Sequence, residues 1–96
     1  MHIILSPQRR DDALTLGRQG DVLVINGDAL DFSALGEGDL LPREAVDHPF
    51  VVSDVERVDG RVTLTLILPH GAGASQAARF PADIIDPPDG PVEVPT

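Results

Sequence analysis

The residues of this chain that could do chemistry are three histidines, sixteen carboxylates and one glycine-rich segment. The segment His70-Gly71-Ala72-Gly73-Ala74-Ser75 follows a stretch of strand character, where a phosphate-binding loop or a nucleophile with its base could lie. A Walker-type loop needs a lysine before its Ser or Thr, and the chain has no lysine. A dinucleotide fingerprint needs a third glycine where Gln76 stands. We therefore predict an ordinary surface loop at 70–75.

His48 follows Glu44 and Asp47, and one helical turn would bring Glu44 and His48 to the same face as metal ligands. Pro49 disfavours the helical conformation for the residue before it, which spoils that geometry. A structural zinc site also needs about four ligands. We expect His48 to lie in a solvated loop without a metal.

Paired carboxylates can act as general acid and base when their surroundings separate their pKa values. The candidates lie on faces of the expected strands that should be solvated, where little would raise a pKa. Asp11-Asp12 and the segment 28–31 also miss the spacing of a calcium loop. We predict no catalytic, cofactor-binding or metal-binding residue, and no enzymatic activity. The candidates are Asp28, Asp31, Asp54, Glu56 and Asp59.

Composition narrows the expected partners and location. The chain has 96 residues and a formal net charge of −9, and all seven of its basic residues are arginine. Nucleic acids and anionic membranes repel such a chain, so we expect neither as a partner. It has no cysteine, hence no disulfide framework, and no apolar stretch long enough to span a membrane. The start lacks the basic region of a signal peptide, which favours a cytoplasmic location.

Alternation of apolar and polar residues predicts a three-stranded antiparallel meander over 13–16, 22–25 and 29–32. Asn26-Gly27 predicts a type I′ turn that pairs Leu23 with Leu30. A turn at Gln19-Gly20 would pair Leu16 with Leu23. Together the two turns give one apolar face, formed by Leu14, Leu16, Leu23, Ile25, Leu30 and Phe32.

A second hairpin is predicted over 50–68, turning at Asp59-Gly60. Its register pairs Arg57 with Val62 near the turn and Val51 with Leu68 at the far end. One face is apolar, formed by Val51, Val55, Val62, Leu64, Leu66 and Leu68. The polar face carries three exceptions, Val52, Val58 and Ile67, which could meet another layer or a partner subunit.

These patterns predict a mainly β fold: a meander plus a second hairpin, in a small sandwich or partly open barrel. Residues 3–5 could add an N-terminal strand and 80–85 a last edge strand, while 41–46 fit one short helical turn, the only helix expected. We expect one domain over 1–85. Residues 86–96 hold four prolines and three acids, which predicts a flexible tail.

Several segments together resemble a family of small uncharacterised proteins encoded in tailed-phage and prophage gene clusters, near tail genes. The segments are 3–7, 14–16, 25–35, 41–45 and 66–71. The family has no assigned activity, so the resemblance implies no functional residue. It implies a phage context, with a location in the bacterial host cytoplasm or in the virion.

The sequence leaves two functions open, and a third, a small hydrolase or metal-dependent enzyme, would need a deep pocket containing His70 or His48 beside two carboxylates. The first is a non-enzymatic accessory or structural protein that acts through contacts with other proteins, with self-association as one form of such contact. The alternative is an acidic decoy that occupies the basic surface of a host nucleic-acid-binding protein, using Asp54, Glu56, Asp59 and the tail.

Overall fold

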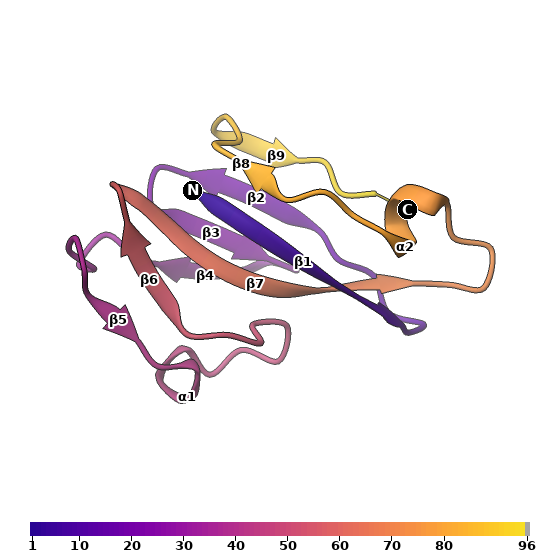
Figure 1. Cartoon of the computed structure of the whole chain (residues 1–96), viewed down its shortest axis with the longest axis horizontal. Helices are drawn as coiled ribbons and strands as arrows, with labels where there is room; N and C mark the ends of the chain where they lie inside the picture. The colour runs from indigo at the N-terminus through magenta and orange to yellow at the C-terminus, as the bar shows by residue number, and fades with distance from the viewer. Residues whose placement is uncertain (96) are drawn as a thin grey trace.

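The computed structural model describes residues 1–95 and shows a small two-sheet protein (Figure 1). Its strands are β1 (His2–Arg9), β2 (Leu16–Gln19), β3 (Val22–Ile25), β4 (Asp28–Asp31), β5 (Leu40–Leu41), β6 (Val55–Val58), β7 (Arg61–His70), β8 (Ile84–Ile85) and β9 (Gly90–Val92). Its helices are α1 (Arg43–Val46) and α2 (Gln76–Arg79).

The strands form a five-stranded sheet in the order β5-β6-β7-β1-β8 and a four-stranded sheet in the order β4-β3-β2-β9. All neighbouring strands are antiparallel except β1 and β7, which run parallel. The two predicted hairpin units therefore lie in different sheets, and the predicted mainly β fold of a small sandwich is confirmed. The N-terminal strand joins the hairpin sheet.

The meander has three antiparallel strands as predicted, but its first strand lies at Leu16–Gln19 instead of 13–16, and its register differs. Asn26 and Gly27 have φ values of 50° and 85°, as a type I′ turn requires, and Leu23 pairs with Leu30 as predicted. Leu16, however, pairs with Ile25 rather than with Leu23. The reason is the turn: Gly20, with φ of 59°, is its first central residue, so Gln19 pairs with Val22. The shift is by an even number of residues, so the apolar side chains stay on one face.

The second hairpin also turns where predicted, since Asp59 and Gly60 have φ values of 51° and 78° and Arg57 pairs with Val62. Its far end differs, because Val51 pairs with Leu66 instead of Leu68. Extra residues bulge out between Val51 and Val55. There the Ser53 hydroxyl accepts a hydrogen bond from the Thr65 amide at 2.8 Å, replacing a strand partner.

Two short helical turns are present where the sequence predicted one. The expected turn is α1, with Pro42 immediately before it as the N-cap residue. The additional turn is α2, whose N-cap Ser75 accepts a hydrogen bond from the Ala78 amide through its hydroxyl at 3.2 Å. The predicted loop at 70–75 therefore ends in a helix cap, since Ser75 is its last residue.

The prediction that the C-terminal segment packs little is wrong for residues 86–95, while Thr96 lies outside the described residues. Gly90–Val92 forms β9 at the edge of the four-stranded sheet, with Val92 opposite Leu16. Proline is tolerated there because an edge strand needs backbone partners on one side only. The Asp89 carboxylate also accepts a hydrogen bond from the Gly20 amide at 2.9 Å, and Pro87 is buried.

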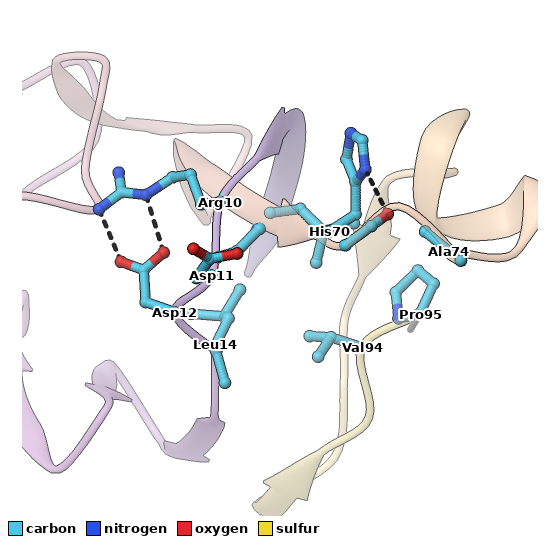
Figure 2. A pocket seen from close by; sticks show the side chains of 13 residues that line it. Arg10, Asp11, Asp12, Leu14, His70, Ala74, Val94 and Pro95 are labelled. Carbon is cyan, nitrogen blue, oxygen red and sulfur yellow. Dashed lines mark hydrogen bonds and ion pairs between the residues drawn. The ribbon is translucent and has the colours of Figure 1, made fainter.

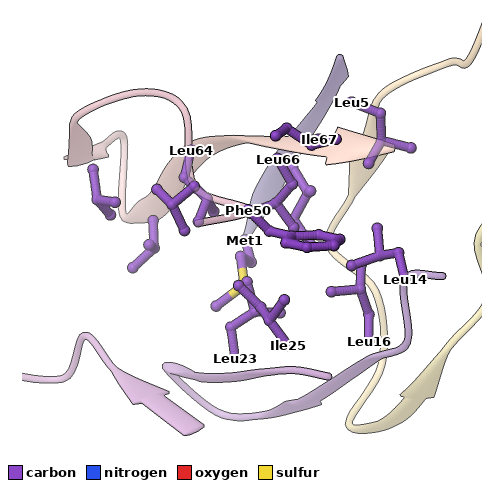
Figure 3. Packing of buried hydrophobic residues seen from close by; sticks show 14 of the residues in the cluster. Met1, Leu5, Leu14, Leu16, Leu23, Ile25, Phe50, Leu64, Leu66 and Ile67 are labelled. Carbon is purple, nitrogen blue, oxygen red and sulfur yellow. The ribbon is translucent and has the colours of Figure 1, made fainter. Parts of the chain in front are cut away.

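The core lies between the two sheets. In Figure 3, Leu64 and Leu66 of one sheet point toward Leu23 and Ile25 of the other, with Phe50 beside them. The predicted core residues are buried except Leu30, which is half-buried. Of the three apolar exceptions on the polar face of the second hairpin, Ile67 is buried, Val52 is half-buried and Val58 is 45% exposed.

Candidate binding site

A pocket of about 430 Å³ opens where the chain leaving β1 passes the end of β7 and the segment after β9 (Figure 2). Its floor is apolar and includes Leu14 and Leu68, both buried, and Val94, which is half-buried. Each comes from a different part of the chain, so the pocket exists only because residues 86–95 fold back onto the domain. Its size is in the range typical of ligand-binding clefts.

The charged rim of the pocket is formed by three consecutive residues. Arg10 donates two hydrogen bonds to the Asp12 carboxylate, at 2.9 Å and 2.6 Å. The bond from Arg10 lowers the pKa of Asp12. Arg10 also lies over the Phe50 ring, with its guanidinium carbon 5.1 Å from the ring centroid. Within residues 1–95, no ion pair or side-chain hydrogen bond engages the Asp11 carboxylate.

The glycine-rich segment borders this pocket without placing His70 and Ser75 together as base and nucleophile. His70 ends β7, and its Nδ1 lies 3.3 Å from the Gly71 carbonyl oxygen. Ser75 uses its hydroxyl to cap α2. His70 and the neighbouring Gly71, Gly73 and Ala74 form part of the pocket wall, so His70 lines the same pocket as Asp11 and Asp12. No hydrogen bond or ion pair joins His70 to either carboxylate within residues 1–95.

His48 is held by protein groups and does not pair with Glu44. Its Nδ1 accepts a hydrogen bond from the Phe50 amide at 3.1 Å, so its Nε2 carries the proton and donates to Asp28 at 3.0 Å. The helix ends before His48, because Asp47 adopts a left-handed conformation with φ of 51°. His48 therefore links the loop after α1 to β4 across the sheets. Its side chain is 7% exposed, so the prediction that it is solvated is wrong, because Asp28 and the Phe50 amide hold the ring against the protein.

Of the other candidate carboxylates, Asp31 and Asp54 bind backbone amides. Asp31 accepts a hydrogen bond from the Ser33 amide at 2.9 Å, which lowers the pKa of Asp31, and Asp54 accepts one from the Arg43 amide at 2.9 Å. A general acid requires the opposite shift, a raised pKa. Within residues 1–95, the structure holds no group of three or more His, Asp or Glu side chains arranged to bind a metal ion.

The pocket was missed in the sequence because its residues lie in four separate segments. Neither Asp11-Asp12 nor residues 94–95 carries a local pattern that indicates a pocket. The local signal is the spacing of Arg10 and Asp12, which lie two residues apart and can pair with each other. The chemistry that the pocket offers is ion pairing at the rim and apolar contact at the floor.

No helix in the described part of the chain is both long and apolar enough to cross a membrane. No protein-family model, curated protein or solved structure matches the chain.

Proposed function

We propose that this protein is a non-enzymatic accessory or structural protein of a phage or prophage and acts by contacting other proteins. The observation that carries the proposal is apolar surface on the outer face of the five-stranded sheet. Leu40 is 52% exposed, Val58 is 45% exposed and Ile85 is 55% exposed. Leu40 and Val58 lie on the neighbouring strands β5 and β6, while Ile85 lies on β8 at the opposite edge of the sheet. Exposed apolar side chains on neighbouring strands are typical of interaction surfaces.

Strand register places these side chains on the same face. Leu40 pairs with Glu56, which pairs with Thr63, and His2 pairs with both Thr63 and Ile85. Directly opposed residues share a face, so this row crosses all five strands. Val58 lies two residues beyond Glu56 on β6 and joins the same face. The result is a face with apolar side chains near its two edges and polar residues between them.

The resemblance to phage and prophage proteins supplies the biological context. A role in the assembly or regulation of phage particles places the protein in the bacterial cytoplasm or in the virion. Gene neighbourhood tests this context directly, since a phage accessory protein should be encoded near tail genes.

The test of contact with other proteins is affinity capture of the tagged protein from phage-producing cells, followed by analysis of purified particles. We expect a phage structural component to be captured. The variant Leu40→Ser/Val58→Thr should reduce that capture at least tenfold. The matched control Val24→Thr changes a half-buried residue of the other sheet and should retain capture. Failure to capture a phage component, together with absence from particles, would contradict the proposal.

The acidic decoy is retained as a second candidate because of how the positive charges are used. Side chains of five of the seven arginines are engaged within the protein, by Asp12, Asp21, Asp86 and carbonyl groups. The surface therefore presents more negative charge than positive. Binding to a host nucleic-acid-binding protein that weakens steeply with salt, and that DNA competes away, would favour this candidate.

A further inference from the structure

We propose that the pocket behind Asp11 receives an arginine or lysine side chain of a partner protein. This inference rests on the proposed function, which is contact with other proteins, and it specifies the chemistry of the partner. The aliphatic stem of the incoming side chain lies on the apolar floor, and its charged end pairs with the Asp11 carboxylate.

The charge of the rim selects a cation. Arg10 and Asp12 neutralise each other through two hydrogen bonds. Asp11 lies between that pair and the end of β7, and it leaves the rim with one uncompensated negative charge (Figure 2). The Asp11 carboxylate would repel an anion that enters the pocket and attract a cation.

The apolar floor of the pocket favours a side chain with a long aliphatic stem over a small inorganic cation. Pro69, Val94 and Pro95, all half-buried, offer apolar surface to the interior of the pocket. Arginine and lysine carry three or four methylene groups that bind such surface while the head group stays at the rim. A small inorganic cation would gain nothing from the floor, so the combination favours a basic side chain.

Contacts within the protein also hold the rim of the pocket in place. Asp12 orients Arg10, and Arg10 lies over the ring of Phe50, a buried core residue. Asp11 is thus carried on a loop that is held to the core on its own side of the pocket. The net charge of the whole chain adds long-range attraction for a basic partner.

The test is an NMR titration of the full chain with a capped peptide that contains one central arginine, at constant ionic strength. The neutral control is the same peptide with citrulline, which has the same shape without the charge. We expect saturable shifts of the backbone amides of Asp11, Ala13 and Ala74 with the arginine peptide. The citrulline peptide should bind at least tenfold more weakly.

The variant Asp11→Asn should abolish the preference for arginine over citrulline. The control Asp47→Asn removes an equal charge from an exposed residue outside the pocket and should keep that preference. Absence of saturable shifts, or equal binding by the Asp11→Asn variant, would overturn the inference. Agmatine, a free cation with the arginine stem, is the third probe; if it binds as tightly as the peptide, the site serves a small molecule instead of a protein.

This result is separable from the proposed function. If affinity capture yields a phage component whose binding is unchanged by Asp11→Asn, the proposed function stands and the pocket inference fails. If the pocket binds the arginine peptide but capture yields no phage component, the proposed function fails while the cation site stands.

Discussion

Arg57 joins the two sheets through one side chain. It lies on β6, yet its guanidinium reaches Asp21 at 3.0 Å and the Phe32 carbonyl at 3.4 Å, both next to strands of the other sheet. It also donates to the carbonyl of Leu35. The Arg57 side chain is 15% exposed, whereas the Asp21 side chain is 37% exposed and reaches water. Loss of the guanidinium would remove the donor that the carbonyl groups of Phe32, a buried residue, and Leu35 share.

We predict that Arg57→Met lowers the free energy of unfolding by about 2 to 3 kcal/mol, because methionine replaces the stem but not the hydrogen bonds. Urea denaturation measures the change. The control Arg9→Met removes an exposed arginine at the end of β1 and should stay within about 0.5 kcal/mol of the wild type. Equal effects of the two substitutions would show that Arg57 does not hold the sheets together.

At the scale of elements, the hairpin turns depend on glycine for backbone conformation rather than for space. Gly60 has φ of 78°, and a side chain there would meet nothing within 4 Å. An alanine at this position is therefore penalised only by its backbone strain. Gly71 has equally open surroundings without a positive φ, which makes it a matched comparison.

Gly60→Ala should destabilise the protein by about 1 kcal/mol or slightly more, the usual cost of a left-handed conformation for a residue with a Cβ atom. Gly71→Ala should change stability by less than about 0.5 kcal/mol. Thermal or urea unfolding of the two variants decides the matter. If Gly60→Ala lowers the free energy of unfolding no more than Gly71→Ala does, the backbone at Gly60 does not require a positive φ.

Strand β9 gives the C-terminal segment a structural role. It covers the edge of β2, and the Arg18 side chain donates to the Pro87 carbonyl. Val92 and Val94 are half-buried against the core. Burial of these two valines alone would not offset the entropy lost when the segment is ordered. The segment packs because it also supplies hydrogen-bond partners to backbone groups of β2.

Truncation after Ile85 is therefore expected to lower the free energy of unfolding by about 2 kcal/mol, from lost valine burial and strand hydrogen bonds. For a domain of this size the melting temperature should fall by roughly 8 to 16 °C. Truncation after Pro95 is the control and should have little effect. If the variant truncated after Ile85 melts within a few degrees of the full chain, the segment contributes little to stability.

At the scale of the whole molecule, Asp86 connects the two ends of the chain. Its carboxylate accepts hydrogen bonds from Arg61 at 3.0 Å and 2.7 Å and from the Met1 amino group at 3.1 Å, while its backbone amide donates to the Met1 carbonyl. The bonds from Arg61, and next those from the amino group, lower the pKa of Asp86. Its φ of 50° is one that asparagine also adopts.

The lowered pKa determines how stability depends on pH. A carboxyl group with a lower pKa in the folded state stabilises the protein fully above its unfolded pKa and loses that contribution as the pH falls through the folded pKa. The stability difference between wild type and Asp86→Asn should therefore be constant from about pH 7 to 5 and shrink below about pH 4. Urea midpoints measured across this range test it.

Asp47→Asn is the control for the pH series, since Asp47 has nearly the same φ, 51°, and is exposed. Its stability difference from the wild type should be small throughout. A difference between wild type and Asp86→Asn that persists undiminished at low pH would mean that ionisation of Asp86 is not what stabilises the fold.

The sequence by itself determined the hairpins β3-β4 and β6-β7, their turns at Asn26-Gly27 and Asp59-Gly60, and the side chains that face the core. These features depend on residues close together in the chain: Asn26-Gly27 and Asp59-Gly60 adopt their positive φ values locally, and alternation assigns Leu23 or Leu64 to a face. Even the two register differences preserved the buried faces, because each shift was by an even number of residues.

Only the tertiary structure decided the parallel pairing of β1 with β7, the place of β9 beside β2, and the pocket at Asp11. Each joins segments separated by more than fifty residues, and no local propensity encodes such a distance. The free energy that favours these pairings comes from backbone groups and apolar surface that become partners only after the rest of the chain has folded. Arg57 is the intermediate case: the hairpin register put a charge on an apolar face, and the structure supplied the carbonyls and the carboxylate that it binds.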